Sequence, residues 1–539
     1  MKNPFRIEER PGEEAPREIY GYRPHLLALS ASWASALYGY DSAFIGGTLS
    51  LPAFQSTFGL ATASGTAKAN LSSNIVSTYQ AGAFFGAIVT FFLAERIGRK
   101  RTLLSSTGVF LVGAILQMIG RIDCLYAGRA ICGLAIGMST AVVPIYVSEC
   151  APAAIRGRLV GMFEVMLQVA LVCGFWVNYG VNKNFSPTSS VQWRLPVGIQ
   201  FIPAGLLLGC MLPMVDSPRW LVSRGKRDEA VKALSWLRNL PADHPYLVRE
   251  LATIELAVEH ELEGLTGPGS DTNRWKQIAK EASQKGIRNR ILLAMLLMVL
   301  QNFTGINAIN YYSPTIFKSI GYTGTSTGLL GTGIFGIVKM TATLLYAGFL
   351  VDKVGRRTLL LVGGVFAGIA MFYLAGYSKI SGSFDHVPKR DGGANAAVAM
   401  IYIYALFYGM SWNGIPWLFG SEVLPTRVRT AGMAAATCIQ WLSQFVVVYS
   451  LPHMILGISY GTFLFYGAWT VVAIVFAYLF VPETKGVQLE DMDLLFGPDV
   501  TVFAIPAMRN YDEALRARVV AGDEKQGNRE DDVVYAEVV

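Results

Sequence analysis

Long apolar stretches, each of about 20 residues or more, divide most of this chain of 539 residues into segments long enough to cross a lipid bilayer. Hydrophobic residues make up 52% of the chain and charged residues only 15%, whereas about a quarter of a typical soluble chain is charged. We therefore predict an all-α membrane protein with twelve membrane-spanning helices. The expected spans are residues 26–49, 71–94, 102–121, 124–148, 158–181, 192–214, 289–313, 328–351, 358–378, 396–421, 430–453 and 459–481.

Two charged motifs occur once in each half of the chain. A Ser-Glu pair, with an arginine seven residues after the glutamate, is found at Ser148–Arg156 and again at Ser421–Arg429. A charged loop with a Gly-Arg pair at Glu95–Arg101 returns at Asp352–Thr358. The copies lie 273 and 257 residues apart, close to half of the chain. This repetition predicts two pseudo-symmetric six-helix bundles, and membrane proteins built in this way usually move a solute across the bilayer.

Lysine and arginine gather in every other connection between the expected spans. Such connections stay in the cytosol, so we expect a multi-pass protein of the plasma membrane with both termini cytoplasmic. The net charge of +7 then reflects topology rather than nucleic-acid binding. Sequons at Asn70 and Asn184 lie on the expected outer face, where glycosylation is feasible. The positive connections are 95–101, 149–158, 216–290, 352–357 and 422–429, and the loop 379–395 is a partial exception.

Five segments follow from these spans. Within the linker between the bundles, 227–240 and 247–262 have the pattern of short amphipathic helices. The linker is too small and too polar for an enzyme domain, and we expect it to clamp the two bundles. The expected segments are a cytosolic tail at 1–25, an N-terminal bundle at 26–214, a cytosolic helical linker at 215–288, a C-terminal bundle at 289–481 and a largely disordered cytosolic tail at 482–539.

Motifs for enzyme chemistry are weak. Gly331–Gly336 fits a dinucleotide fingerprint, but it lies within an expected membrane helix rather than after a strand. No P-loop is present, and the six cysteines show no CxxC pairing. We therefore predict no enzyme activity, no cofactor and no metal. Glycines spaced four apart are expected instead to let helices pack closely, in the pairs Gly82/Gly86, Gly133/Gly137 and Gly205/Gly209.

Four charged residues lie inside the expected spans, where a charge needs a partner or water. Asp41 and Arg129 fall in neighbouring helices of the first half. A carboxylate that alternates between pairing with arginine and accepting a proton couples transport to protons, and the alternative is a permanent structural salt bridge. Glu164 and Lys339 belong to opposite halves. They could neutralise each other until a substrate carboxylate competes for Lys339, or they could only lock the halves together.

Amide and aromatic side chains gather on several expected spans. Amides both donate and accept hydrogen bonds, and aromatic rings cover the apolar face of a ring, so the set suits a polyhydroxylated cyclic ligand. Each residue taken alone could equally join neighbouring helices. The set is Gln168, Gln301, Asn302, Asn307, Asn310, Tyr311, Tyr312, Asn413, Trp417, Gln440, Trp441 and Gln444.

The motifs together resemble the sugar porter family of the major facilitator superfamily over residues 26–497. Within that family, Gly39–Gly46 and the stretch through Pro52–Phe54 look most like fungal quinate permeases. The matching stretches are Glu95–Lys100, Asp352–Arg357, the two Ser-Glu motifs, Ser217–Trp220, Gln301–Asn307 and Pro482–Gly486.

The resemblance implies the major facilitator fold and an alternating-access transporter with its ligand site between the halves. Gln301, Asn307, Trp417 and Gln440 occupy the family's ligand-contact positions. Asp41 and Arg129 match the proton-coupling pair of its symporters. The resemblance also implies a cytosolic latch of the outward-facing state, which would contain Glu95, Arg99, Glu149, Arg156, Asp352, Arg356, Glu422 and Arg429.

Three positions depart from the family's sugar carriers. Glu164 and Asn302 stand where those carriers have glutamine, and Lys339 stands where they have asparagine. A cation in place of a neutral amide favours a ring polyol that bears a carboxylate. We predict proton-coupled uptake of quinate or a related hydroxylated cyclic carboxylate, with the substrate, protons and the bilayer as partners. The alternatives are a neutral monosaccharide carrier, as symporter or facilitator, and a non-transporting nutrient sensor.

Overall fold

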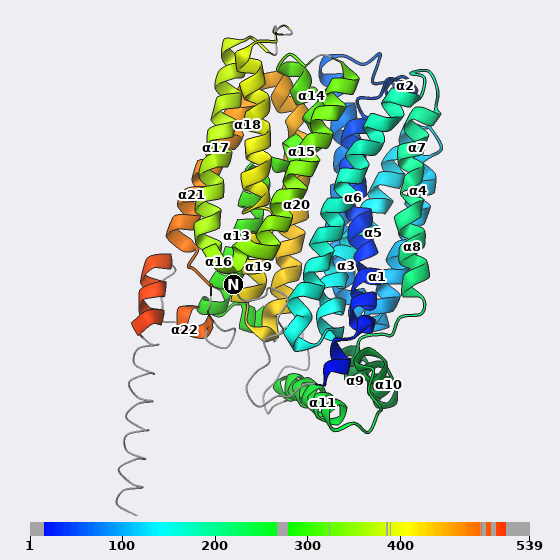
Figure 1. Ribbon diagram of the computed structural model, residues 1–539, viewed down its shortest axis with the longest axis vertical. Coiled ribbons are helices and arrows are strands. Elements are labelled where there is room, and N and C mark those ends of the chain that lie inside the picture. Colours follow the sequence, from blue (N-terminus) through cyan, green and yellow to red (C-terminus); the bar gives the residue numbers. More distant parts are fainter. Residues whose placement is uncertain are drawn as a thin grey trace, which may run out of the picture.

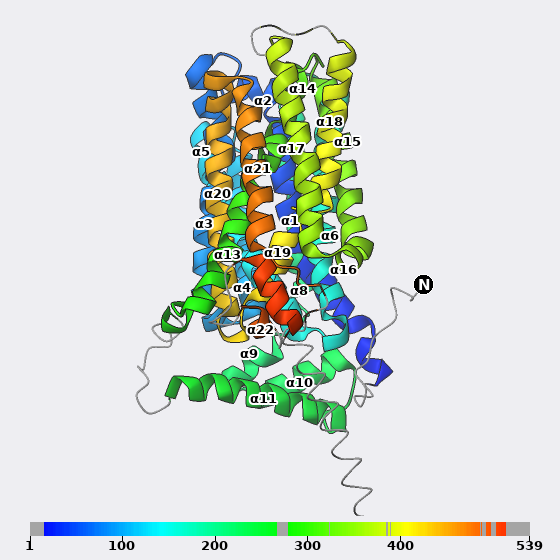
Figure 2. The same ribbon diagram turned by 90° about the vertical axis from the view of Figure 1, so that its left-hand side faces the viewer.

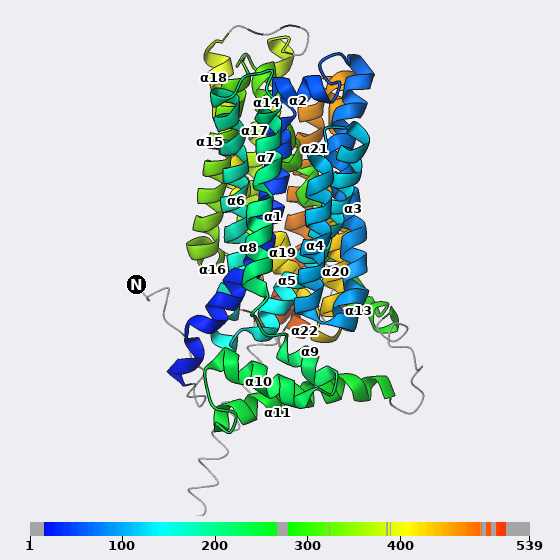
Figure 3. The ribbon, with the colours of Figure 1, turned by 90° about the vertical axis from the view of Figure 1, so that its right-hand side faces the viewer.

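A computed structural model describes residues 16–266, 279–322, 324–383, 386, 388, 390–485, 487, 492–496 and 503–513, and within these residues it contains helices and no strands. Two bundles of long helices stand side by side, and short helices lie beneath one end of them (Figure 1). We call the end next to α9–α11 the linker end and the opposite end, where α2 lies, the far end. The views after a quarter turn show α9–α11 beneath the same end of the molecule (Figures 2 and 3).

The first half of the chain forms one bundle and the second half forms the other. The first comprises η1 (Arg17–Tyr20), α1 (Tyr22–Thr48), α2 (Pro52–Thr57), α3 (Gly65–Ile97), α4 (Arg99–Gln117), α5 (Ile122–Cys150), η2 (Ala153–Ile155), α6 (Arg156–Asn184), α7 (Val191–Ile199) and α8 (Phe201–Met211). The second comprises α13 (Lys285–Phe303), α14 (Ile306–Ser319), α15 (Thr325–Leu345), η3 (Tyr346–Leu350), α16 (Val351–Val354), α17 (Arg356–Ile380), α18 (Gly392–Gly409), α19 (Ile415–Val423), α20 (Thr426–Ile458) and α21 (Gly461–Phe480). The linker contains α9 (Pro218–Ser223), α10 (Arg227–Arg238) and α11 (Pro245–Thr266), and α22 (Met492–Phe496) follows the second bundle.

All twelve expected spans are helical. Ten of them are long and apolar enough to cross a membrane, and α1 and α4 are the other two. Four serines lower the apolar character of α1, but they are buried within the bundle. Ser30 and Ser32 each donate to a backbone carbonyl four residues earlier, over 2.7 Å. Because these hydroxyls are satisfied inside the helix, α1 can be polar and still lie at membrane depth.

Two spans that the sequence predicted as continuous, 289–313 and 396–421, are broken in the middle. The first divides into α13 and α14 at Gly305, whose φ of 96° lies in the region that favours glycine. A Cβ added there would also lie 2.8 Å from Met371. The second divides into α18 and α19 around Trp412 and Asn413, whose carbonyls accept hydrogen bonds from Gln301. Both breaks lie in the second bundle, and the hydrogen bonds of Gln301 join one broken helix to the other.

The glycine pairs predicted for close packing gave mixed results. A Cβ on Gly82 would lie 2.0 Å from the carbonyl oxygen of Ala130, and one on Gly133 would lie 1.9 Å from that of Tyr79. Helices α3 and α5 therefore touch through their backbones, as predicted. Gly205 and Gly209 have no atom within 4 Å of such a Cβ, so that prediction was wrong.

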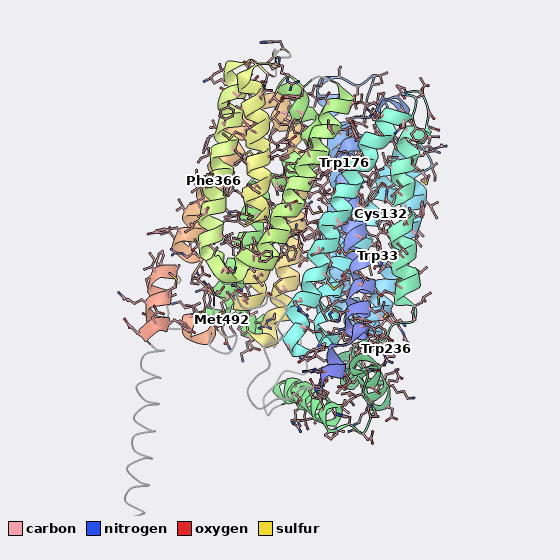
Figure 4. All side chains as sticks on the ribbon, viewed as in Figure 1. Trp33, Cys132, Trp176, Trp236, Phe366 and Met492 are labelled. Carbon is pink, nitrogen blue, oxygen red and sulfur yellow. The ribbon has the colours of Figure 1, made fainter. Side chains whose placement is uncertain are left out.

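The linker is attached to the first half. Arg238 of α10 donates to the carboxylate of Glu250 and, over 2.8 Å, to the carbonyl of Cys150 at the end of α5. The indole of Trp220 donates to the carbonyl of Glu95 over 2.9 Å. Arg23 reaches down from α1 to the carbonyl of Trp236, which Figure 4 shows in the linker below that helix. These contacts fix the linker to one bundle, and the expected clamp to the second bundle stays a prediction.

Candidate functional site

A cavity of about 2050 Å³ lies between the two halves. Its inner wall includes Asn310 and Tyr311 of α14, and its outer wall includes Glu149, Arg156 and Arg249 at the linker end. Arg156 is exposed to solvent. The cavity therefore connects the polar residues at the centre of the molecule with the surface at the linker end.

The far end is closed by contacts between the halves. Asn182 of α6 donates to Ser326 of α15 over 2.8 Å, and a ring nitrogen of His453 lies 2.7 Å from the side-chain oxygen of Asn70. At Gly46 the backbone of α1 comes so close to α14 that an added Cβ would lie 2.5 Å from the carbonyl oxygen of Tyr311. The structure is thus open at the linker end and closed at the far end.

Asp41 and Arg129 form an ion pair in the interior of the first half. Both side chains are fully buried, and Nη1 of Arg129 donates to Oδ1 of Asp41. Arg129 also donates through Nε to the carbonyl of Ile75 over 3.2 Å, and its guanidinium lies 4.6 Å from the centre of the Tyr79 ring. Among the described residues, Oδ2 of Asp41 and Nη2 of Arg129 have no hydrogen-bond partner. The structure brings the predicted pair together and leaves each partner incompletely satisfied.

Glu164 and Lys339 face the same cavity from opposite halves. Oε1 of Glu164 accepts hydrogen bonds from Gln168 and, across the interface, from Asn413, each over 2.7 Å. Lys339 is 3% exposed and lies near enough to Glu164 to interact electrostatically. No ion pair within 4.0 Å joins the two among the residues that the structure describes. The carboxylate is therefore held by amides, while the ammonium faces the cavity.

Two predicted ligand amides of α13 also hold the broken helices. Gln301 donates to the carbonyls of Trp412 and Asn413 over 2.8 and 3.0 Å. Asn302 donates to the carbonyl of Met298 over 2.8 Å, and its oxygen accepts from Asn307 over 2.6 Å. Asn307 stands in the first turn of α14, so the positive end of that helix dipole lies at the cavity.

Several acceptors in the cavity wall lack a donor. The side-chain oxygens of Gln168, Asn310 and Gln440 are buried and have no partner among the described residues. Buried acceptors of this kind call for a hydrogen-bond donor. Trp417 lines the same space with its ring half-buried. The site thus offers unused acceptors, one cation and an aromatic surface to a ligand.

Each half carries a charge cluster at the linker end of its bundle. In the first, Arg99 binds Glu149 through Nε and Nη2, over 3.0 and 3.1 Å, and Glu95 over 3.3 Å. Burial lowers the pKa of Arg99, but Glu149 and then Glu95 outweigh it, so the pKa lies above its usual value. In the second cluster, Arg356 binds Glu422 over 2.9 Å. The duplicated motifs therefore form the same ion pair twice.

Of the remaining latch residues, Arg156 and Arg429 line the cavity from opposite halves. Arg429 donates to the carbonyl of Leu424 over 3.1 Å. Neither arginine forms an ion pair within 4.0 Å with Glu149 or Glu422 in the described part of the chain. The side chain of Asp352 lies outside the described residues.

Sequence reasoning missed one part of both charge clusters. Asp216 accepts from the backbone NH groups at the start of α4, and Ser217 donates to Glu149. The second half repeats this arrangement. Glu483 accepts from the backbone NH of Arg356 at the start of α17 over 2.8 Å, and Thr484 donates to Glu422 over 2.8 Å. The available signal was an acid followed by a hydroxyl residue directly after the last span of each half.

Comparison with known proteins gives consistent matches over most of the chain. A family model described as "Sugar (and other) transporter" matches residues 27–496. The "Quinate permease" of Neurospora africana is 42% identical over 516 residues, which cover 94% of this chain and 93% of that protein. The "Probable quinate permease" of Neosartorya fischeri is 43% identical over 496 residues, covering 91% and 90%.

Two solved structures of a bacterial protein share the fold. The "proton:xylose symporter XylE bound to 6-bromo-6-deoxy-D-glucose" matches with a TM-score of 0.70 and 26% identity, over 88% of this chain and 99% of that one. The "inward open conformation of the xylose transporter XylE from E. coli" matches with a TM-score of 0.70 and 25% identity, over 88% and 100%. These matches confirm the two-bundle, twelve-helix architecture predicted from the sequence.

Proposed function

The chain belongs to the sugar transporter family, and we propose that it imports a hydroxylated cyclic carboxylate such as quinate together with a proton. Because its relatives are named permeases and its fold is that of a solute symporter, it is a multi-pass secondary transporter and not an enzyme. One observation carries the finer proposal: Lys339 presents a buried ammonium to a cavity whose amide oxygens lack donors.

The proposed ligand satisfies both kinds of group. Its carboxylate binds Lys339, and its ring hydroxyls donate to the oxygens of Gln168, Asn310 and Gln440. A neutral sugar would supply the hydroxyls but leave the ammonium without an anion, apart from the nearby Glu164. An ammonium that is only 3% exposed favours a charged partner, because hydrogen bonds to charged groups contribute about 1.5–3 kcal/mol.

The anion also explains why coupling is needed. Moving one negative charge into an inside-negative cell costs about 2.3 kcal/mol per 100 mV, and one accompanying proton cancels that charge. We propose that Asp41 accepts this proton and releases Arg129, whose present ion pair is the deprotonated form. Substrate and proton then leave together through the cavity.

We place the linker end in the cytosol. The positive connections of the sequence lie at that end, and positive loops remain cytoplasmic, so we propose that both termini are cytoplasmic. We further propose the plasma membrane as the location, because import of a solute into the cell takes place there. The open cavity is accordingly the inward-facing state. In the outward-facing state, we propose that the glutamates of the two charge clusters meet Arg156 and Arg429 across the halves and close the linker end.

Uptake of labelled quinate and labelled glucose, in cells without carriers of their own, tests the function. We expect faster quinate uptake at acidic than at alkaline pH and its collapse with a protonophore. The variant Lys339→Asn should raise the KM for quinate by about 10- to 100-fold, the loss of one hydrogen bond to a charged group. Lys318→Asn, an exposed lysine on the same half, is the control.

Three results would contradict the proposal. Glucose uptake that ignores pH, with no uptake of quinate, would indicate a neutral-sugar facilitator. If the Lys339→Asn variant keeps the parent's preference between quinate and glucose, Lys339 and Glu164 serve only to neutralise each other. Failure of any solute to accumulate would favour the alternative of a non-transporting sensor of the same fold.

A further inference from the structure

A chain of hydrogen bonds leads from the candidate ligand site toward the Asp41–Arg129 pair. Nε2 of Gln440 donates to Oε1 of Gln444 over 3.1 Å, and Nε2 of Gln444 donates to the hydroxyl of Tyr311 over 3.0 Å. Gln440 and Gln444 lie one turn apart on α20, and Tyr311 is buried on α14. All three belong to the second half, yet the chain ends against the first.

The hydroxyl of Tyr311 has one proton and needs an acceptor for it. Since Gln444 already donates to the oxygen, that proton must point elsewhere. The hydroxyl lies beside Ser42 and Gln80 of the first half, close enough to interact with both side chains. The Ser42 hydroxyl and both polar atoms of the Gln80 amide are buried and have no partner among the described residues. The available acceptors for Tyr311 are therefore on the other half.

Asp41 is the neighbour of Ser42 in the chain and lies next to these unpartnered groups. Ser42 follows it in α1, and Oδ2 of Asp41 is itself buried and unpartnered. The cavity is lined by Ser42, Tyr311 and Gln444 but not by Asp41 or Arg129. Tyr311 thus occupies the boundary between the cavity and the ion pair. Unpartnered polar atoms gathered in this way are typical positions for ordered water.

The packing of α1 on α14 sets the position of Tyr311. At Gly46 the two backbones touch at the carbonyl of Tyr311, so the first half contacts the backbone of the residue whose hydroxyl Gln444 binds. This contact exists because the far end is closed. Opening that end must separate α14 from α1 and take the Tyr311 hydroxyl away from Ser42 and Gln80.

We propose that Tyr311 and Gln444 are positioning residues that couple ligand binding at Gln440 to the protonation of Asp41. The inference rests on the proposed function, since it needs a substrate at Gln440 and a proton at Asp41. A ligand hydroxyl that donates to the unpartnered Oε1 of Gln440 turns that amide and breaks the hydrogen bond from its Nε2 to Gln444. Gln444 then releases Tyr311, and the hydroxyl reorients relative to Ser42 and the water next to Asp41. The transported proton moves between solvent and the Asp41 carboxylate, and Tyr311 keeps its own.

The test uses the full-length protein in liposomes and measures two quantities. One is the number of protons that move with each substrate, from pH-sensitive dye and labelled substrate. The other is substrate-for-substrate exchange, which requires binding and both conformations but no net proton movement. The variants are Tyr311→Phe and Gln444→Met. Tyr373→Phe is the control, because that hydroxyl donates to the carbonyl of Gly393 over 3.4 Å within the second half and Tyr373 does not line the cavity.

We expect fewer protons per substrate and a flatter pH profile in Tyr311→Phe and Gln444→Met, with exchange reduced much less than pH-driven uptake. The control should match the parent protein in both. An unchanged proton ratio in both variants would overturn the inference, and so would an equal loss of exchange and uptake, since that is the result of a purely structural role. Parent protein that moves substrate without protons would instead overturn the proposed function, and this outcome is seen before any variant is made.

Discussion

Replacing Gly46 by alanine should shift the transporter away from the conformation described above. In this structure the new methyl group would lie 2.5 Å from the carbonyl oxygen of Tyr311, whereas ordinary contacts begin at 3.4 Å. Helix α14 would have to move outward by about 1 Å. Overpacking of this kind costs about 1–3 kcal/mol. The intrinsic gain of alanine over glycine in a helix, about 1 kcal/mol, is present in both conformations and cancels.

The cost falls only on the state in which α1 touches α14. Since 1.4 kcal/mol is a factor of ten, the ratio of inward-facing to outward-facing protein should fall by about 5- to 150-fold. Accessibility from the linker end reports this ratio. Ser421 lines the cavity there, so a cysteine at that position, in protein without the six native cysteines, should react more slowly with a maleimide in the Gly46→Ala variant.

Gly180→Ala is the control for this experiment. Gly180 also lies in a membrane-spanning helix of the first half, but nothing lies within 4 Å of an added Cβ. That variant should react at the parent rate. An unchanged rate in well-folded Gly46→Ala protein would show that α1 and α14 keep their contact in both states, which would refute the assignment of this contact as the far-end closure.

Three further outcomes are expected. Asp41→Asn should allow exchange of labelled substrate but abolish its accumulation against a gradient, as measured by counterflow and by net uptake in the same vesicles. Arg238→Ala should destabilise the linker by about 3–5 kcal/mol, because it leaves Glu250 without its buried partner, and limited proteolysis should then cleave the linker faster while the bundles stay intact. The double variant Arg156→Gln and Arg429→Gln should favour the inward-facing state, so that the Ser421→Cys probe reacts faster than in the parent; a slower reaction would exclude these arginines from the latch.

Sequence predicts local features of this protein well and contacts between the halves poorly. The twelve spans follow from apolar length alone, which is a property of each segment. Even there, α1 is not among the ten helices that are long and apolar enough to cross a membrane, and its serines can lie at membrane depth because they bond to the helix's own carbonyls. The breaks in two spans depend on a left-handed glycine at Gly305 and on the hydrogen bonds of Gln301, which no pattern of hydrophobicity records.

The candidate site shows the same division. Proximity of Asp41 and Arg129 could be expected, because both lie at similar depth in one bundle. The partners of Glu164 could not, since Asn413 comes from the other half and from a helix break. The link from Gln444 to Tyr311 joins two helices of one half, but its meaning depends on Ser42 and Gln80 across the interface. These contacts join residues of opposite halves that are far apart in the sequence, so no local pattern specifies them.

The two charge clusters explain how the protein can open at the linker end without stranding buried charge. Glu149 and Glu422 are each held by an arginine and a hydroxyl of their own half, so separation of the halves leaves both carboxylates paired. Only Arg156 and Arg429 lose ionic partners in the proposed cycle, and both then face the water-filled cavity. Breaking a buried ion pair costs about 3–5 kcal/mol, whereas an exposed pair contributes about 0–1 kcal/mol. Keeping the buried pairs within each half therefore holds the difference between the two conformations small enough for a substrate and a proton to reverse it.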